Sequence, residues 1–305
     1  MPAIAQHNID FNVEGIDEVT LHAGKALADR DLMSPYVWEQ KDGDFGIMVR
    51  AVPQVVSETG DTGTIYYGVS EDGLNFHMDP TPVLSPGPDP LDIGGCEDPT
   101  PVMWDGQMIV YYTGVDATRA SGNMLYAVGP DVRRLEKQGI ALASSKTAGN
   151  TKEATISRTA DGHWRLFYEY ARDDASLIGL AMGDGVAGPW HEKPAPFAPR
   201  PKAWDSWHLS TGPMLTTNPD RPVMFYNGAT QDARWRIGWV VFNRDCTAVV
   251  DRCIEPLIVP PPPNERSGVD IAFAASVIHR DGMAHLYYSL GDKVLRRAKV
   301  RRSAS

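Results

Sequence analysis

Carboxylate side chains stand next to amide and cationic side chains in two short polar segments of the sequence. The segment GGCEDPT contains Glu97 and Asp98, and the segment NTKEAT contains Asn150, Lys152 and Glu153. Pairs of carboxyl groups cleave glycosidic bonds, one as a general acid and the other as a base or nucleophile. These residue types therefore favour chemistry on a sugar, whose hydroxyl groups bind to carboxylates.

The elements that must position these groups are short aromatic runs that recur along the chain. Five such runs begin at Phe45, Met108, Trp164, Val223 and Ala284. An Asp-Gly pair precedes four of them, and a Pro-Asp-Arg-Pro segment precedes the run at Val223, so each run is predicted to be the second arm of a β-hairpin. A second apolar segment follows each run, and successive units lie roughly 55 to 65 residues apart.

Five repeats of this kind predict an all-β chain folded as a five-bladed β-propeller. We expect residues 1–305 to form a single catalytic domain, with blades at roughly 35–80, 95–135, 150–195, 205–250 and 265–300. A β-sandwich or a pair of barrels also has many short strands, but neither explains the five-fold recurrence. The only helix candidate is the region from Glu18 to Arg30.

The innermost strands of a propeller line a central channel, so polar residues at their ends converge on one mouth. Besides the residues named above, the candidates at these ends are Arg50, Glu169, His208, Asn227, Asp270 and Asp292. His208 lies in the segment WDSWHLSTG, whose aromatic residues suit a sugar-binding loop. The predicted site is therefore rich in carboxylates with aromatic and cationic neighbours.

Several motifs, taken in order, resemble glycoside hydrolase family 130, the β-mannoside phosphorylases and mannosidases. GGCEDPT resembles the G-x-E-D-P-R segment of that family, NTKE its N-x-K-D, FYNG its Y-H-G, and YYSLGDKVLRRA its Y-Y-G-A-A-D-x-x-x-x-x-A. The resemblance spans most of the chain and implies a five-bladed propeller that acts on glycosides.

The resemblance also implies roles for the matching residues. Asp98 would be the general acid, which in this family protonates the glycosidic oxygen indirectly through a sugar hydroxyl, and Glu97 would anchor the sugar. Glu153 would replace the Asp of the family motif. The residues that would bind the sugar in the −1 subsite are Arg50, Asn150, Lys152 and Asp292.

Three departures from the family pattern favour hydrolysis over phosphorolysis. Thr100 follows E-D-P where the family has Arg, Glu169 stands where another Arg is expected, and Asn227 replaces the His of Y-H-G. Proteins hold phosphate with Arg, Lys or His, so we expect an inverting, exo-acting hydrolase of β-mannosides or a related small glycoside. Glu169 is then the candidate base, and Asp98 and Glu169 lie on neighbouring predicted blades.

Three alternatives stay open. A phosphorylase of the same family that uses inorganic phosphate requires only that a neighbouring cation, such as His208, takes the place of a missing Arg. The segments KEATISRTADGHWRLFYEY and GLAMGDGVAGPW resemble glycoside hydrolase family 43, in which Glu153 would be the acid and Asp98 would tune its pKa. The chain has Ser34-Pro35 where that family has the Asp-Pro of its base. The non-enzymatic rival is a propeller that binds carbohydrate without turnover.

Composition disfavours other classes of protein. The chain has 29 Lys and Arg against 39 Asp and Glu, a net charge of −10, so nucleic acid is not an expected partner. No apolar stretch is long enough to span a membrane and the N-terminus does not resemble a leader, so we expect a cytoplasmic protein without a membrane partner. The spacing of Cys96, Cys246 and Cys253 fits no metal site, and we expect neither a metal nor another cofactor. The expected partner is an oligosaccharide or small glycoside substrate, and assembly into a homo-oligomer stays open.

Overall fold

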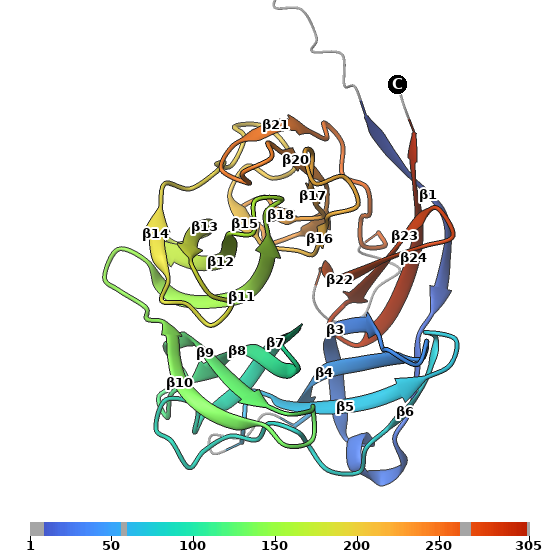
Figure 1. The fold of residues 1–305 in the computed structure, drawn as a ribbon, viewed down its shortest axis with the longest axis vertical. Coiled ribbons are helices and arrows are strands. Elements are labelled where there is room, and N and C mark those ends of the chain that lie inside the picture. Colours follow the sequence, from blue (N-terminus) through green and yellow to red (C-terminus); the bar gives the residue numbers. More distant parts are fainter. Residues whose placement is uncertain (1–8, 56–59, 263–269, 304–305) are drawn as a thin grey trace, which may run out of the picture.

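The computed structural model describes residues 9–55, 60–262 and 270–303, and these form five sheets or sheet pairs arranged as a ring (Figure 1). The described elements are strands, apart from one 3-10 helix at Gly24–Leu27. The predicted all-β, five-bladed propeller is therefore confirmed.

The first three blades each run from an innermost strand next to the central channel to an outer edge. Blade 1 contains β3 (Arg30–Glu39), β4 (Phe45–Pro53), β5 (Thr64–Ser70), β6 (Asn75–Met78) and β2 (Thr20–His22). Blade 2 contains β7 (Gly95–Trp104), β8 (Gln107–Val115), β9 (Gly122–Gly129) and β10 (Glu136–Leu142). Blade 3 contains β11 (Gly149–Arg158), β12 (Trp164–Arg172), β13 (Ala175–Gly183) and β14 (His191–Lys193).

Blade 4 is divided into two small sheets, because its first three strands are each interrupted. One sheet contains β15 (His208–Ser210), β18 (Asn227–Ala229) and β19 (Trp235–Ile237). The other contains β16 (Met214–Leu215), β17 (Val223–Met224), β20 (Val240–Phe242) and β21 (Val249–Arg252). Blade 5 contains β22 (Ala272–Arg280), β23 (Met283–Leu290), β24 (Val294–Ser303) and β1 (Asp10–Glu18).

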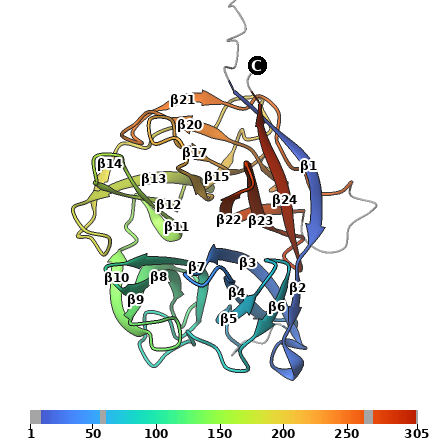
Figure 2. The ribbon, with the colours of Figure 1, turned by 45° about the vertical axis from the view of Figure 1, so that its right-hand side comes forward.

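The N-terminal strand closes the ring by completing the last blade. β1 pairs antiparallel with β24 along its whole length, from Asp10 opposite Ser303 to Glu18 opposite Arg296 (Figures 1 and 2). Ion pairs across this ladder join Glu18 to Arg296 and Asp17 to Arg297. The outer edge of β24 is thus covered by the first described strand of the chain.

The turns between the first two strands of blades 2 and 5 follow the predicted Asp-Gly chemistry. Asp105 and Gly106 both have positive φ, as do Asp281 and Gly282, and each pair forms the whole loop between two strands. Positive φ at both positions is the signature of the tight hairpin turn that Asp-Gly favours. The Asp-Gly pairs therefore set the register of these hairpins, as the sequence predicted.

The aromatic runs fill the spaces between neighbouring blades. Tyr111, Phe167, Phe225 and Tyr287 lie in or next to the second strands and are fully buried. The Phe167 ring in blade 3 packs 5.2 Å from the Phe242 ring in blade 4, measured between centroids. Burying such rings removes large apolar surfaces from water, so these contacts hold the blades together and fix the channel between them.

Two details differ from the expected element boundaries. The region from Glu18 to Arg30 forms β2 and a single 3-10 turn instead of a longer helix, because residues Thr20–His22 pair in parallel with Asn75–His77 of β6. The expected start of the fifth blade, at residue 265, lies outside the described residues. All three cysteines are buried and free. No helix in the described part of the chain is long and apolar enough to cross a membrane.

Candidate active site

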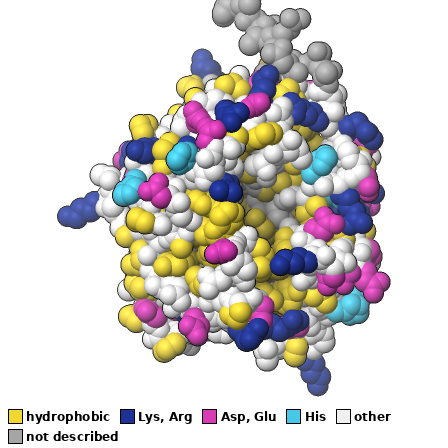
Figure 3. Space-filling model, viewed as in Figure 1, with side chains coloured by type: hydrophobic (Ala, Val, Ile, Leu, Met, Phe, Trp, Pro, Cys, Tyr) yellow, Lys and Arg dark blue, Asp and Glu magenta, His cyan; other side chains and the backbone are white. Residues whose placement is uncertain are grey.

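Innermost strands of four blades carry a β-bulge where they border the channel. The register of pairing shifts within β3, β7, β11 and β22. At three of these shifts the backbone is left-handed, with φ of 51° at Ser34, 50° at Asp98 and 52° at Glu153. A bulge re-aims a side chain out of the regular alternation of a strand, and these three residues line one common channel. The face shown in Figure 3 is hollowed near its centre, with acidic and basic side chains around the hollow.

Arg50 of β4 joins the two neighbouring carboxylates of the GGCEDPT segment. Its Nη2 lies 2.6 Å from Oε1 of Glu97 and its Nη1 lies 3.3 Å from Oδ1 of Asp98. Nε and Nη2 also donate to the Thr62 carbonyl oxygen, at 3.1 and 2.9 Å. Burial opposes the charged form of Arg50, but the charges of Glu97 and Asp98 outweigh it and raise the pKa of the guanidinium. Arg50 is thus a fixed cation that orients both carboxylates.

The two oxygens of the Asp98 carboxyl have different surroundings. Oδ1 accepts a hydrogen bond from the Ser34 hydroxyl at 2.9 Å in addition to the contact with Arg50. Oδ2 is buried and has no hydrogen-bond partner among the described residues. Buried polar atoms are almost always paired, so an unpaired oxygen at the channel identifies the atom with which a substrate can exchange a hydrogen bond or a proton.

Glu153 occupies the equivalent bulge in blade 3 but lacks a comparable cation contact. Burial and the nearby charge of Asp98 raise its pKa well above the ordinary range of a glutamate, although Lys152 acts in the opposite direction. A carboxyl with a raised pKa holds its proton at pH values where other carboxyls are charged. The surroundings of Glu153 therefore favour its neutral form, in which the carboxyl can donate a hydrogen bond to a group in the channel.

Lys152, Glu169 and Ser176 form a second connected group at the rim of blade 3. Lys152 and Glu169 are cross-strand partners, and Nζ lies 3.3 Å from Oε1. The Ser176 hydroxyl donates to the same Oε1 at 2.7 Å. The charge of Glu169 raises the pKa of the Lys152 ammonium. Since both contacts use Oε1, Oε2 of Glu169 is left without a hydrogen bond from the described residues.

His208 extends this rim into blade 4. The backbone N–H of Ser176 donates to Nδ1 of His208 at 3.1 Å, so the remaining ring nitrogen, Nε2, carries the proton of the neutral imidazole. Burial lowers the pKa of His208, which favours this neutral form. The ring stacks on Trp235 at 5.5 Å between centroids, and Trp235 in turn packs against Phe273. The site thus has an aromatic wall that bears an oriented N–H donor.

Asn150 and Asp292 lie at the edges of the same region. Oδ1 of Asn150 accepts a hydrogen bond from the Gly122 N–H at 2.9 Å. Asp292 follows β23 with φ of 53°, and burial raises its pKa while Arg50 lowers it. Asp292 is therefore in electrostatic contact with Arg50, Asp98 and Lys152.

Two predicted binding residues serve packing or loop contacts instead. Asn227 is fully buried, and its amide nitrogen donates to the carbonyl oxygens of Thr211 at 2.6 Å and Ala274 at 3.2 Å. Its amide oxygen accepts the Ala274 N–H at 2.7 Å, so the side chain joins blades 4 and 5. Asp270 lies 3.5 Å from Nε of Arg234, and its carbonyl oxygen accepts the Trp235 N–H.

The site contains groups that sequence reasoning missed. Ser34 appeared only as the residue that replaces an expected aspartate, whereas in the structure it binds Asp98 from another blade. Ser176 connects Glu169 to His208, and Trp235 supports His208. The Ser-Pro dipeptide in a predicted innermost strand, aligned with the Asp-Pro of blade 2, is the signal that could have indicated Ser34 as a bulge residue.

Carboxyl groups outnumber cations in the assembled site. Glu97, Asp98, Glu153, Glu169 and Asp292 stand against Arg50 and Lys152 as the charged groups in electrostatic contact with one another. Sugars suit such a surface, because their hydroxyls donate to carboxylates, whereas an anion requires one of the cations to exchange its partner. The geometry therefore gathers a carboxyl-rich surface around the buried, unpaired Oδ2 of Asp98.

A family model described as β-1,4-mannooligosaccharide phosphorylase, Glyco_hydro_130, matches residues 40–301 of the chain. The chain belongs to glycoside hydrolase family 130. The resemblance drawn from the E-D-P and N-x-K motifs is thus confirmed, and the match favours family 130 over the family 43 alternative. Membership supports an enzyme that acts on glycosides.

Relatives of this family 130 chain include phosphorylases. It is 24% identical over 233 residues to the 1,2-β-oligomannan phosphorylase of Thermoanaerobacter sp. (strain X514), a match that covers 75% of each chain. Among solved structures, the β-1,2-mannobiose phosphorylase of Listeria innocua, in complex with β-1,2-mannobiose, has a TM-score of 0.73 at 18% identity, with 94% of this chain and 90% of that chain covered.

A further solved structure is described with the statement that the family 130 of mannoside phosphorylases contains glycoside hydrolases that target β-1,2 mannosidic linkages in Candida mannan. It has a TM-score of 0.75 at 21% identity, with 94% of each chain covered. At these identities the structural matches establish the propeller fold. The expectation that hydrolysis is favoured is not supported by the curated relatives, which are named phosphorylases.

Proposed function

We propose that this family 130 protein cleaves β-mannosidic bonds by phosphorolysis, with Asp98 as the general acid. The observation that carries the proposal is the buried, unpaired Oδ2 of Asp98 at the channel, with Oδ1 held by Ser34 and Arg50. The family match and the names of its curated relatives support phosphorolysis of a β-mannoside. Because the relatives are named for β-1,2 linkages, β-1,2-mannobiose is the first substrate to test.

In the proposed reaction, the side chains of this site bind the sugar and move one proton. Arg50, Asn150, Lys152 and Asp292 would bind the sugar in the −1 subsite. Asp98 transfers its proton, directly or through a sugar hydroxyl, to the oxygen that leaves the anomeric carbon, while a phosphate oxygen forms the new bond to that carbon from the opposite face. Phosphorolysis then inverts the anomeric configuration and gives a sugar 1-phosphate.

Phosphate would enter beside Lys152 and His208. Lys152 supplies a cation that is already held at the rim by Glu169, and the Nε2–H of His208 supplies a neutral donor next to it. This set is weaker than a pair of arginines. We therefore expect phosphate to bind less tightly here than at a site that retains the Arg of the E-D-P-R motif.

Hydrolysis is the second candidate, and a specific observation favours it. The Thr100 hydroxyl, in place of the Arg of the family motif, donates to the Ala154 carbonyl oxygen at 2.7 Å and is not available to an anion. Glu169 leaves its Oε2 free of hydrogen bonds from the described residues, so it can accept a proton from water as the base of an inverting hydrolase.

The test incubates the full chain with β-1,2-mannobiose, and separately with β-1,4-mannobiose, in the presence and absence of inorganic phosphate. Mannose 1-phosphate formed only with phosphate, and absent with Asp98→Asn, is the expected result. Free mannose formed equally without phosphate would support hydrolysis and overturn phosphorolysis. Binding of mannobiose without any product would support the non-catalytic carbohydrate-binding propeller.

Glu169→Gln separates the two candidate reactions with a single matched variant. For a phosphorylase, Glu169 only holds Lys152, so we expect a change in KM for phosphate and a small change in kcat. For a hydrolase that uses Glu169 as base, the same substitution removes the base and lowers kcat by about 10²- to 10⁴-fold.

A further inference from the structure

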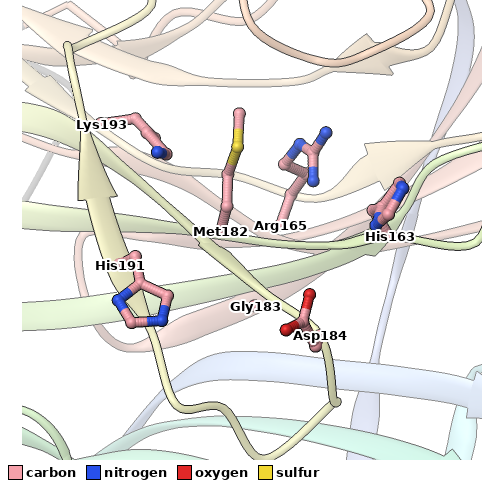
Figure 4. Close-up of a pocket in the computed structure, with 7 residues that line it drawn as sticks. All are labelled: His163, Arg165, Met182, Gly183, Asp184, His191 and Lys193. Atoms are coloured by element: carbon pink, nitrogen blue, oxygen red, sulfur yellow. The ribbon is translucent and has the colours of Figure 1, made fainter.

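A basic pocket lies on blade 3 at the end of β12 that is remote from the active site (Figure 4). The cavity measures about 370 Å³ and is lined by His163, Arg165, Met182, Gly183, Asp184, His191 and Lys193. Arg165 stands four residues before Glu169 on the same strand, which separates them by about 13 Å. This volume falls within the range of small-molecule sites.

The side chains of this pocket project from one face of the sheet because of strand register. Arg165 of β12 lies opposite Met182 of β13, which lies opposite His191 of β14. His163, Asp184 and Lys193 each lie two positions from one of these residues, so side-chain alternation places them on the same face. In Figure 4, Lys193, Met182, Arg165 and His163 follow one another across the view, with His191 and Asp184 below them.

Arg165 is a buried cation without a carboxylate partner in the described part of the chain. Arg165 is 6% exposed. Its guanidinium donates hydrogen bonds only to backbone carbonyl oxygens among the described residues: Nε donates to that of Asp245 at 2.9 Å, and Nη1 to that of Trp164 at 3.0 Å. No described carboxylate lies within 4.0 Å of the guanidinium, and Nη2 makes no hydrogen bond to the described residues. Burying a charge without a counter-charge is costly, so this position is arranged to receive an anion.

We propose that this pocket binds the phosphoryl group of a small phosphorylated sugar. Arg165 contacts the phosphoryl oxygens from the floor through Nη2, and Lys193 contacts them from the exposed rim. Asp184 is the one carboxylate among the lining residues. It accepts hydrogen bonds from sugar hydroxyls, and its negative charge repels inorganic phosphate, which has no hydroxyl-bearing sugar to offset that repulsion. The two imidazoles, His163 and His191, supply further donors around the ligand.

Calorimetric titration of the full chain with mannose 6-phosphate, inorganic phosphate and mannose tests the proposal. Mannose 6-phosphate has its phosphate away from the anomeric carbon, so glycosidic phosphorolysis neither forms nor consumes it. We expect it to bind, and we expect Lys193→Ala to weaken binding about tenfold because a charge-assisted contact is lost. Lys193→Ala should leave turnover of mannobiose unchanged.

The matched control is Lys152→Ala, which removes a lysine from the active site on the same blade and should leave this binding unaltered. If Asp184→Asn weakens mannose 6-phosphate and not inorganic phosphate, the ligand is a phosphorylated sugar. If both probes bind equally to Lys152→Ala, both lose binding when Lys193→Ala is added, and Asp184→Asn has no effect, the pocket is a site for free phosphate, which retains the phosphoryl chemistry and overturns the sugar.

No binding of either phosphate probe would overturn the proposal. Binding that is lost in Lys152→Ala and retained in Lys193→Ala would assign it to the active site and would also overturn the proposal. Arg165→Gln, checked for folding by circular dichroism, should abolish binding if it folds. Because the Lys193 side chain is exposed, we expect Lys193→Ala to fold, so it tests the proposal even if Arg165→Gln does not fold.

Discussion

Blades 2 and 3 present their carboxyl groups to the channel from equivalent bulges but surround them differently. Asp98 is held through Oδ1 by Arg50 and Ser34, and its Oδ2 is unpaired. Glu153 has the same left-handed backbone, yet no described cation lies within ion-pair distance of its carboxyl, and burial raises its pKa. The bulge therefore decides where a carboxyl points, whereas its neighbours decide whether it is charged.

The largest expected effect is a difference in kcat/KM between a substitution of Asp98 and a substitution of Glu153. Asp98→Asn removes the transferable proton, so we expect kcat/KM for mannobiose to fall about 10²- to 10⁴-fold. Glu153→Gln keeps the size and shape of the side chain and leaves Asp98 with both of its contacts, so the loss should be about tenfold or less. Steady-state kinetics of the two variants check this difference, and equal losses would remove the distinction between the bulges.

A smaller effect on kcat should follow when a hydrogen bond that holds the Asp98 carboxyl is removed. Ser34→Ala removes one of the two groups that hold Oδ1, which should lower kcat about five- to tenfold with little change in KM. Ser176→Ala is the matched control, since its hydroxyl supports Glu169 while its backbone N–H still binds His208. A Ser34→Ala variant with wild-type kcat would show that Arg50 alone orients Asp98.

The smallest effect concerns the pH dependence of stability. The pKa of Glu153 is raised in the folded state, so the folded chain holds this proton more tightly than the unfolded chain. Its contribution to stability is therefore complete below the unfolded pKa and is lost as pH rises through the folded pKa. Glu97 and Asp292, whose pKa values are also raised, contribute with the same sign.

Melting curves of wild type and Glu153→Gln from about pH 4 to pH 8 measure this contribution. The wild-type Tm should fall relative to that of the variant by a few degrees as the pH rises. Parallel curves would indicate that the pKa of Glu153 is the same in the folded and unfolded states, which would contradict the raised pKa and its assignment as a hydrogen-bond donor.

Much of the fold followed from local sequence because it depends on local chemistry. The Asp-Gly pairs at 105–106 and 281–282 specify tight turns, and the aromatic runs that follow them specify buried second strands. The proximity of Asp98 and Lys152 follows from blade order, because each lies on an innermost strand of neighbouring blades. The hairpin turns and the five-fold repeat in the sequence are enough to predict these features.

The missed features depend on contacts between residues distant in sequence. Ser34 reaches Asp98 across 64 positions, and no local pattern marks that pairing. Asn227 matched a family motif at the end of a strand, but the interface between blades 4 and 5 buries it and uses both atoms of its amide. The pairing of charged groups could not be predicted from the sequence either, because only the folded structure shows that Glu169 has Lys152 as its partner.

The most direct measurement of the central claim compares two leaving groups in the Asp98→Asn variant. Mannobiose needs a proton on its leaving oxygen, whereas 2,4-dinitrophenyl β-mannoside releases a stable phenolate without one. If Asp98 supplies that proton, the variant should lose nearly all turnover of mannobiose and retain turnover of the aryl mannoside within about tenfold of wild type. Equal losses on both substrates would contradict the account and assign Asp98 to sugar binding alone.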